Sequence, residues 1–64
     1  MMAELILTPN IDGPDDFYED LLSIHEGHSK EESDAINARL ILILSNHIGD
    51  DTVLDAAFAL AKAP

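Results

Sequence analysis

Hydrophobic residues recur with helical spacing in three segments of the chain. At 100° per residue, the apolar positions of segments 14–26, 30–48 and 52–62 gather on one side of a helix, with acidic or small residues mostly opposite. The first ten residues lack this pattern. The spacing therefore predicts an all-α fold, a small antiparallel three-helix bundle forming a single helical domain over residues 11–64, with an N-terminal arm over residues 1–10.

Capping residues mark the predicted helix ends. Pro14 suits a first helical position, and Gly27 suits the end of the first helix. Ser29 and Glu32 have the spacing of a capping box at the start of the second helix, which Gly49 ends. Three residues are candidate N-caps of the third helix: Asp50, Asp51 and Thr52.

The three apolar arcs predict a common core. Two aromatic residues and nine aliphatic residues have the spacing to face one another inside the bundle. We expect these side chains to be buried: Phe17, Leu21, Ile24, Ile36, Leu40, Ile43, Leu44, Val53, Leu54, Phe58 and Leu60.

Apolar residues outside this core form a candidate interface. Leu42 falls on the polar arc of the longest helix, flanked by Ala35, Ala38 and Asn46, and forms a shallow patch that another helix or strand could approach. The arm has three further apolar residues without a core position: Leu5, Ile6 and Leu7. We expect the protein to bind another protein or itself, and a C2 homodimer is the commonest closed assembly. Alternatively, the arm folds back over Leu42 within one chain.

The charge balance excludes several partners. Thirteen acidic residues oppose three basic ones among 64 residues, which gives a formal net charge of −10. Without clustered Lys and Arg we expect no binding to nucleic acid or to an anionic membrane. The longest apolar run, 40–44, is far shorter than a membrane span, and the start lacks the basic region of a signal peptide. We therefore expect a cytoplasmic protein.

Five polar residues stand out by their positions. His25 and His47 both lie on apolar arcs, two residues before a glycine that can end a helix. We expect structural roles, with each side chain hydrogen-bonded near a helix end and no metal bound between the two residues of one chain. An antiparallel pair would place the two imidazoles at opposite ends of the hairpin. Asn37 either fixes the packing register or meets water. Two residues complete the group of candidate structural or functional residues: Arg39 and Asn46.

No pattern indicates an enzyme. A phosphate-binding glycine loop, a nucleophile motif and a convergent carboxylate cluster are all missing, and there is no cysteine. We expect a non-catalytic interaction module with no catalytic residue and no cofactor. The alternative is a small-ligand or metal-binding protein that uses the histidines at the helix ends. An acidic mimic of a nucleic acid is a third hypothesis.

Several short segments resemble one bacterial family. His25-Glu26-Gly27, Asn37-Ala38-Arg39-Leu40 and Asn46-His47-Ile48-Gly49-Asp50 are similar to the markers of domain-of-unknown-function family 2783, over about residues 9–61. His28 departs from the family pattern, where an apolar residue is usual, and the arm is longer. The family has no assigned activity. Its members are often encoded near flavin-dependent aromatic hydroxylases, so the resemblance implies an accessory role beside such an enzyme.

Overall fold

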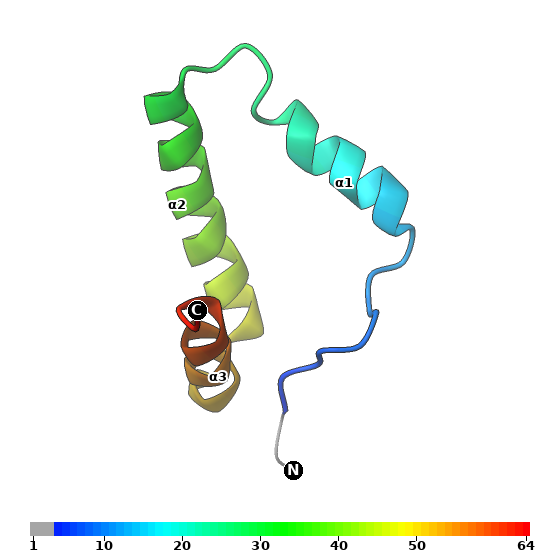
Figure 1. The fold of residues 1–64 in the computed structure, drawn as a ribbon, viewed down its shortest axis with the longest axis vertical. Helices are drawn as coiled ribbons and strands as arrows, with labels where there is room; N and C mark the ends of the chain where they lie inside the picture. Colours follow the sequence, from blue (N-terminus) through cyan, green and yellow to red (C-terminus); the bar gives the residue numbers. More distant parts are fainter. Residues whose placement is uncertain (1–3) are drawn as a thin grey trace.

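The fold of the described residues is all-α, as predicted. The computed structural model describes residues 4–64, and residues 1–3 of the predicted arm lie outside that range. Three helices follow one another, α1 (Pro14–Ser23), α2 (Lys30–Ile48) and α3 (Asp51–Ala61), with no strand in the described part of the chain. The arm enters α1 without regular structure (Figure 1).

Both ends of α2 lie where the sequence predicted them. The Ser29 hydroxyl oxygen accepts a hydrogen bond from the Glu32 backbone N–H at 3.2 Å, and the Ser29 N–H donates to the Glu32 carboxylate at 2.8 Å. At the other end Gly49 adopts φ 66°, a left-handed conformation that favours glycine, and its N–H donates to the carbonyl of Ser45. The capping box and the glycine therefore define the longest helix.

The first helix is shorter than predicted. It ends at Ser23 instead of Glu26, and the chain continues in turns up to Gly27. The Ser23 hydroxyl donates to the carbonyl of Asp20 at 2.7 Å, and the N–H groups of His25 and Glu26 donate to carbonyls three residues back. The Ile24 N–H still donates to the Asp20 carbonyl four residues back, so the tighter pattern begins at His25 and ends the α-helix there.

Asp50 is the N-cap of α3. Its carboxylate oxygen accepts a hydrogen bond from the N–H of Val53 at 3.0 Å, so the first of the three predicted candidates caps the helix. The helix therefore begins at Asp51 and ends at Ala61, one residue before the predicted range at each end.

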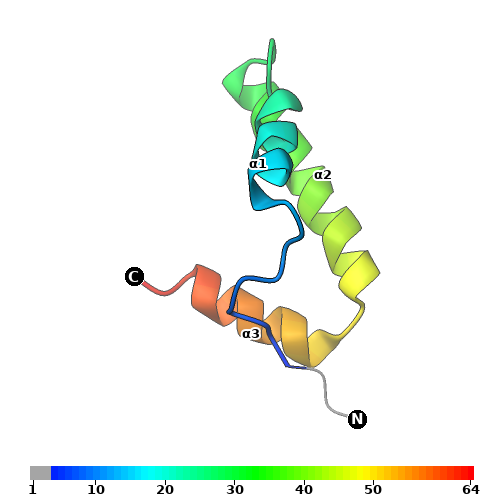
Figure 2. The same cartoon turned by 90° about the vertical axis from the view of Figure 1, so that its right-hand side faces the viewer.

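The helices are splayed. α1 and α2 run in opposite senses but diverge from their connecting loop, and α3 turns back across the far end of α2 (Figures 1 and 2). Among the described residues, α2 and α3 are the one helix pair in contact, and that contact is small. The radius of gyration is 13.8 Å, against about 11 Å expected for a compact chain of this length.

The predicted buried core is wrong for the single chain. No described side chain is fully buried. Five of the predicted core residues are half-buried, and the other six are exposed. The helical spacing correctly places the apolar side chains on common faces, but α1 stands away from α2 and leaves those faces uncovered. The half-buried residues are Leu21, Ile36, Leu40, Val53 and Leu54.

The chain therefore exposes more surface than a folded monomer of its size. Its accessible surface is 5848 Å², while a globular monomer of 7.0 kDa exposes about 4,000 Å². The surplus is about 1,800 Å² per chain. A fold with this much uncovered surface lacks the apolar burial that stabilises a small domain.

Candidate interaction surface

The second half of α2 is apolar around most of its circumference. Exposed aliphatic side chains occur at consecutive positions, among them Ile41 at 57%, Leu42 at 70% and Ile43 at 64% exposure. At about 100° per residue, these three side chains point in three different directions. A helix that is hydrophobic all round is normally surrounded by other elements. The sequence predicted one apolar arc on this helix, which was too narrow. Five consecutive apolar residues, 40–44, already indicated that the helix is apolar on more than one side.

One face of α2 looks towards α1 across an open apolar groove. The groove has a volume of about 280 Å³ and is bordered by the end of the α1 segment and the middle of α2. Four of its five lining residues are aliphatic, and Arg39 is the polar one. The lining residues are Ile24, Ile36, Arg39, Leu40 and Ile43.

A second face of α2 packs against α3. The groove between these helices has a volume of about 310 Å³, and its lining is apolar except for Ser45. α3 contributes Leu54, Ala57, Phe58 and Ala61, and α2 contributes Ile41, Leu44 and Ile48. Because both grooves are open, neither face of α2 is sealed from solvent within the chain.

The third face carries the predicted interface residues of α2. Ala35, Ala38 and Leu42 are all exposed, and helical spacing gathers them on the side of α2 that lines neither groove. Leu42 is 70% exposed, so the alternative in which the arm covers it within one chain is wrong. We call the side formed by Ala35, Ala38 and Leu42 the Leu42 face.

The arm lies elsewhere. Its described start runs beside α3 in both ribbon views (Figures 1 and 2). Leu5, which belongs to this stretch of the sequence, is half-buried. Ile6 and Leu7 are exposed. The six predicted interface residues thus belong to two separate surfaces, one on α2 and one on the arm.

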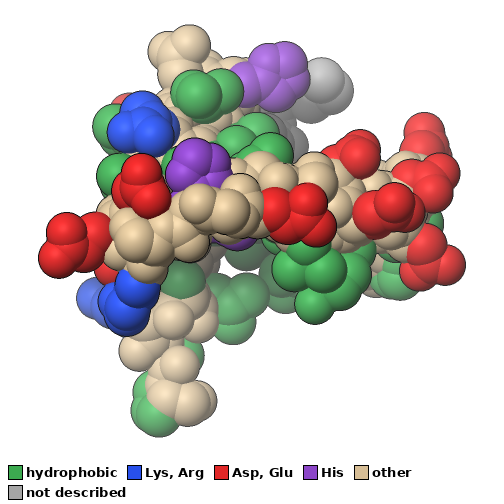
Figure 3. Space-filling model, turned by 90° about the horizontal axis from the view of Figure 1, so that it is seen from above, with side chains coloured by type: hydrophobic (Ala, Val, Ile, Leu, Met, Phe, Trp, Pro, Cys, Tyr) green, Lys and Arg blue, Asp and Glu red, His purple; other side chains and the backbone are tan. Residues whose placement is uncertain are grey.

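Acidic side chains avoid the apolar part of α2. The chain has 13 Asp and Glu residues, but residues 35–49 contain none of them. Arg39 is the one Lys or Arg within residues 35–49. Most of the carboxylates occur instead on α1, in the first turns of α2 and around α3, and the rest lie in the arm and next to α1. Figure 3 shows acidic side chains gathered along α1, with hydrophobic side chains beside them. A contact confined to residues 35–49 would therefore bury no carboxylate of this chain.

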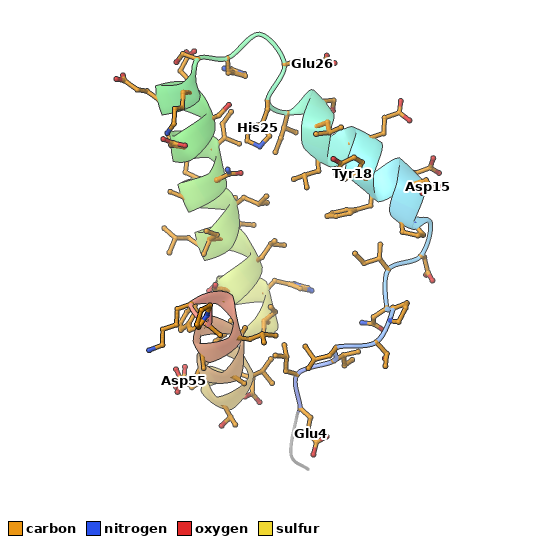
Figure 4. The ribbon with its side chains drawn as sticks, viewed as in Figure 1. Glu4, Asp15, Tyr18, His25, Glu26 and Asp55 are labelled. Atoms are coloured by element: carbon orange, nitrogen blue, oxygen red, sulfur yellow. The ribbon has the colours of Figure 1, made fainter. Side chains whose placement is uncertain are left out.

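The histidines at the helix ends do not meet. His25 precedes α2 and lies between the end of α1 and α2 (Figure 4), while His47 is exposed in the last turn of α2, at the other end of the helix. The Nδ1 atom of His25 is buried without a hydrogen-bond partner, contrary to the predicted bonding near a helix end. Among residues 4–64, no three histidine or carboxylate side chains cluster closely enough to hold a metal ion.

The remaining predicted polar residues face solvent. Asn37 and Asn46 are exposed. Of the two predicted roles for Asn37, contact with water is therefore the one found in the single chain. Arg39 is exposed at the edge of the groove towards α1. In the described part of the chain Lys30 forms an ion pair with Asp34, and the imidazole of His28 lies 3.9 Å from the Glu32 carboxylate, both near the start of α2.

Among residues 4–64, Glu32 is the one side chain with a clearly shifted pKa. The backbone N–H of Ser29 donates to its carboxylate and holds the pKa of Glu32 below its ordinary value of 4.5. The hydrogen bond with the Ser29 side chain lowers this pKa further, and desolvation of the carboxylate opposes it. The nearby His28, whose Nδ1 lies 3.9 Å from the carboxylate, lowers the pKa by the smallest amount. The perturbation belongs to the helix cap.

The family comparison agrees with the sequence resemblance. In the described residues, no helix has the length and apolar character needed to cross a membrane. No curated protein and no solved structure matches the chain. The family described as "protein of unknown function (DUF2783)" matches residues 5–63. Because this match covers nearly the whole sequence, the chain belongs to the DUF2783 family.

Proposed function

We propose that the protein is a non-catalytic interaction module that acts by binding a polypeptide on the apolar surface of α2. The observation that carries this proposal is the exposure of adjacent large aliphatic side chains on three sides of one helix. Contiguous apolar surface of several hundred Å² on a soluble protein marks interaction sites. The binding surface consists of Ile41, Leu42, Ile43, Leu44 and Ile48 with their small neighbours.

The chemistry around this surface supports binding over catalysis. Both grooves on α2 are lined by aliphatic or aromatic side chains, with Arg39 as the polar contributor to one and Ser45 to the other. Catalytic sites combine a pocket with convergent titratable groups whose pKa values are shifted. The perturbed carboxylate, Glu32, bonds the N-cap of its own helix instead. The proposal therefore assigns no catalytic residue.

Binding measurements with purified components test the proposal. Tagged wild-type chain and the Leu42→Asp variant serve as baits, and each polypeptide retained by the wild type is identified, purified and titrated calorimetrically. We expect at least one defined chain, either this one or another such as a flavin-dependent hydroxylase, to bind the wild type with a micromolar or lower Kd. We expect the variant to lose that binding. Purified wild-type protein that binds no polypeptide at all would overturn the proposal.

A further inference from the structure

We propose that the occupant of the Leu42 face is a second copy of this chain, which pairs with it through an antiparallel α2–α2 contact. This inference rests on the proposed function and names the partner. It starts from the arrangement around α2, where three apolar faces lie about 120° apart. The first faces α1, the second packs on α3, and the third is the Leu42 face.

The chain itself can cover two of these faces but not the third. Movement of α1 towards α2 would close the groove around Ile36 and Leu40, and α3 already borders the groove around Leu44. Neither movement reaches Leu42, because its side chain points away from both helices by about 120°. The arm leaves this residue 70% exposed. Coverage of the Leu42 face therefore requires another molecule.

The exposed area is sufficient for a stable dimer. Each chain exposes about 1,800 Å² more than a globular monomer of its mass. A standard interface takes about 800 Å² from each partner. About half of this surplus would provide an interface of that size, and the other half is available for closure of α1 on α2. The small side chains of Ala35 and Ala38 permit a close approach of two helix axes, about 8 Å apart.

The charge distribution along α2 permits a second copy, and the helix macrodipoles favour one direction. Two copies of the segment 35–49 can meet without burying a carboxylate, because this segment has none. The acidic residues of α2 all lie near its start: Glu31, Glu32 and Asp34. A parallel pair would place these carboxylates side by side and align the two helix macrodipoles. An antiparallel pair separates these carboxylates but brings them towards the partner's Asp50 and Asp51, so its advantage lies in the opposed macrodipoles. The antiparallel pair has C2 symmetry, so each Leu42 packs over the partner's Ala38.

Sedimentation velocity on the full-length protein tests the association. We expect the wild type to sediment as a dimer, and Leu42→Met, which conserves volume and apolar character, to do the same. Leu42→Asp should raise the dissociation constant by more than about a hundredfold. Because both chains carry the substitution, it removes two apolar contacts and places two carboxylates in the interface. Leu7→Asp is the matched control, because Leu7 is 71% exposed but lies on the arm.

The outcomes separate this inference from the proposed function. A monomeric wild type that still binds a different chain, with loss of binding in Leu42→Asp, would overturn the inference and leave the proposed function intact. A dimer that Leu7→Asp dissociates, or that Leu42→Asp leaves unchanged, would equally overturn it.

A distance measurement tests the direction without disturbing the interface. The chain has no cysteine, so Lys30→Cys provides one labelling site for spin-label spectroscopy, at an exposed residue at the start of α2. With the symmetry axis between Ala38 and Leu42, the helical rise of 1.5 Å per residue separates the two labels by roughly 30 Å. A parallel pair would place them roughly 10 Å apart. The shorter distance, or no intermolecular distance in the labelled wild-type background, would overturn the proposed arrangement.

Discussion

Dilution should lower the melting temperature of this protein. No described side chain is fully buried, and α1 makes no extended contact with α2, so a lone chain lacks the apolar burial that stabilises small domains. If the helices are held together mainly by a second copy, folding and association form one equilibrium. The perturbation is a hundredfold dilution, from about 100 μM to about 1 μM chain, which costs a dimer about 2.7 kcal/mol of stability through mass action.

The size of the shift follows from the number of residues that unfold together. Unfolding entropy is about 2.1 cal/mol/K per residue, so two chains of 64 residues lose stability by about 0.27 kcal/mol per degree near the midpoint. The dilution should therefore lower the melting temperature by about 10 °C.

Circular dichroism at 222 nm, recorded in cells of different path length, measures this midpoint at both concentrations. The Leu42→Met variant should show the same dependence as the wild type. A midpoint that stays constant over the hundredfold range would refute the coupling of folding to association, because a monomer that folds alone is insensitive to dilution.

Two further predictions concern single side chains. The pKa of Glu32 is lowered in the folded protein, so its contribution to stability is fully present above the ordinary carboxyl pKa and is lost as the pH falls through the lowered folded value. The difference in melting temperature between wild type and Glu32→Gln should be largest near neutral pH and should vanish on acidification; a constant difference would contradict the cap assignment. His25→Leu removes a buried, unpartnered Nδ1 atom, so it should leave stability unchanged or raise it by about 1 kcal/mol in urea unfolding. A loss of more than 1 kcal/mol would indicate that His25 gains a partner in the assembled protein.

Helix ends were predictable where short-range chemistry defines them. The bonds between Ser29 and Glu32 span three residues and require nothing from the rest of the chain, so α2 begins where the sequence predicted. The end of α1 was missed because the backbone changes to hydrogen bonds three residues back at His25, before Gly27 is reached. A 3₁₀ turn of this kind keeps apolar residues at nearly the same spacing, so periodicity does not reveal it.

The core was not predictable from periodicity because an apolar arc specifies a face and not its occupant. Ile36 and Leu40 lie on the arc that the sequence assigned to the core, yet they border an open groove. Leu42 was distinguished from them correctly, since its neighbours in projection are Ala35 and Ala38 and it is the most exposed of the three leucines of α2. The element that covers an apolar face can belong to a second chain. The spacing of apolar residues along one sequence does not identify that element.

Ionic strength distinguishes self-association from capture of a basic partner. Each chain carries a formal charge of −10, so two copies repel each other, and their attraction must come from uncharged contacts such as those of residues 35–49. A basic partner would instead be attracted by the carboxylates of α1. Salt screens both effects, since the Debye length falls from about 20 Å at about 20 mM salt to about 4 Å at about 500 mM.

Raising the salt over this range should therefore tighten self-association, because screening weakens the repulsion and leaves the apolar contact in place. We expect the dimer dissociation constant from sedimentation equilibrium to fall by about tenfold between the two conditions. Leu7→Asp adds one further negative charge to each chain outside the contact and should make this salt dependence slightly steeper. A dissociation constant that rises with salt would mean that opposite charges hold the chains together. It would contradict a contact built on the acid-free half of α2, because that half offers Arg39 as its one permanent charge and no carboxylate to pair with it.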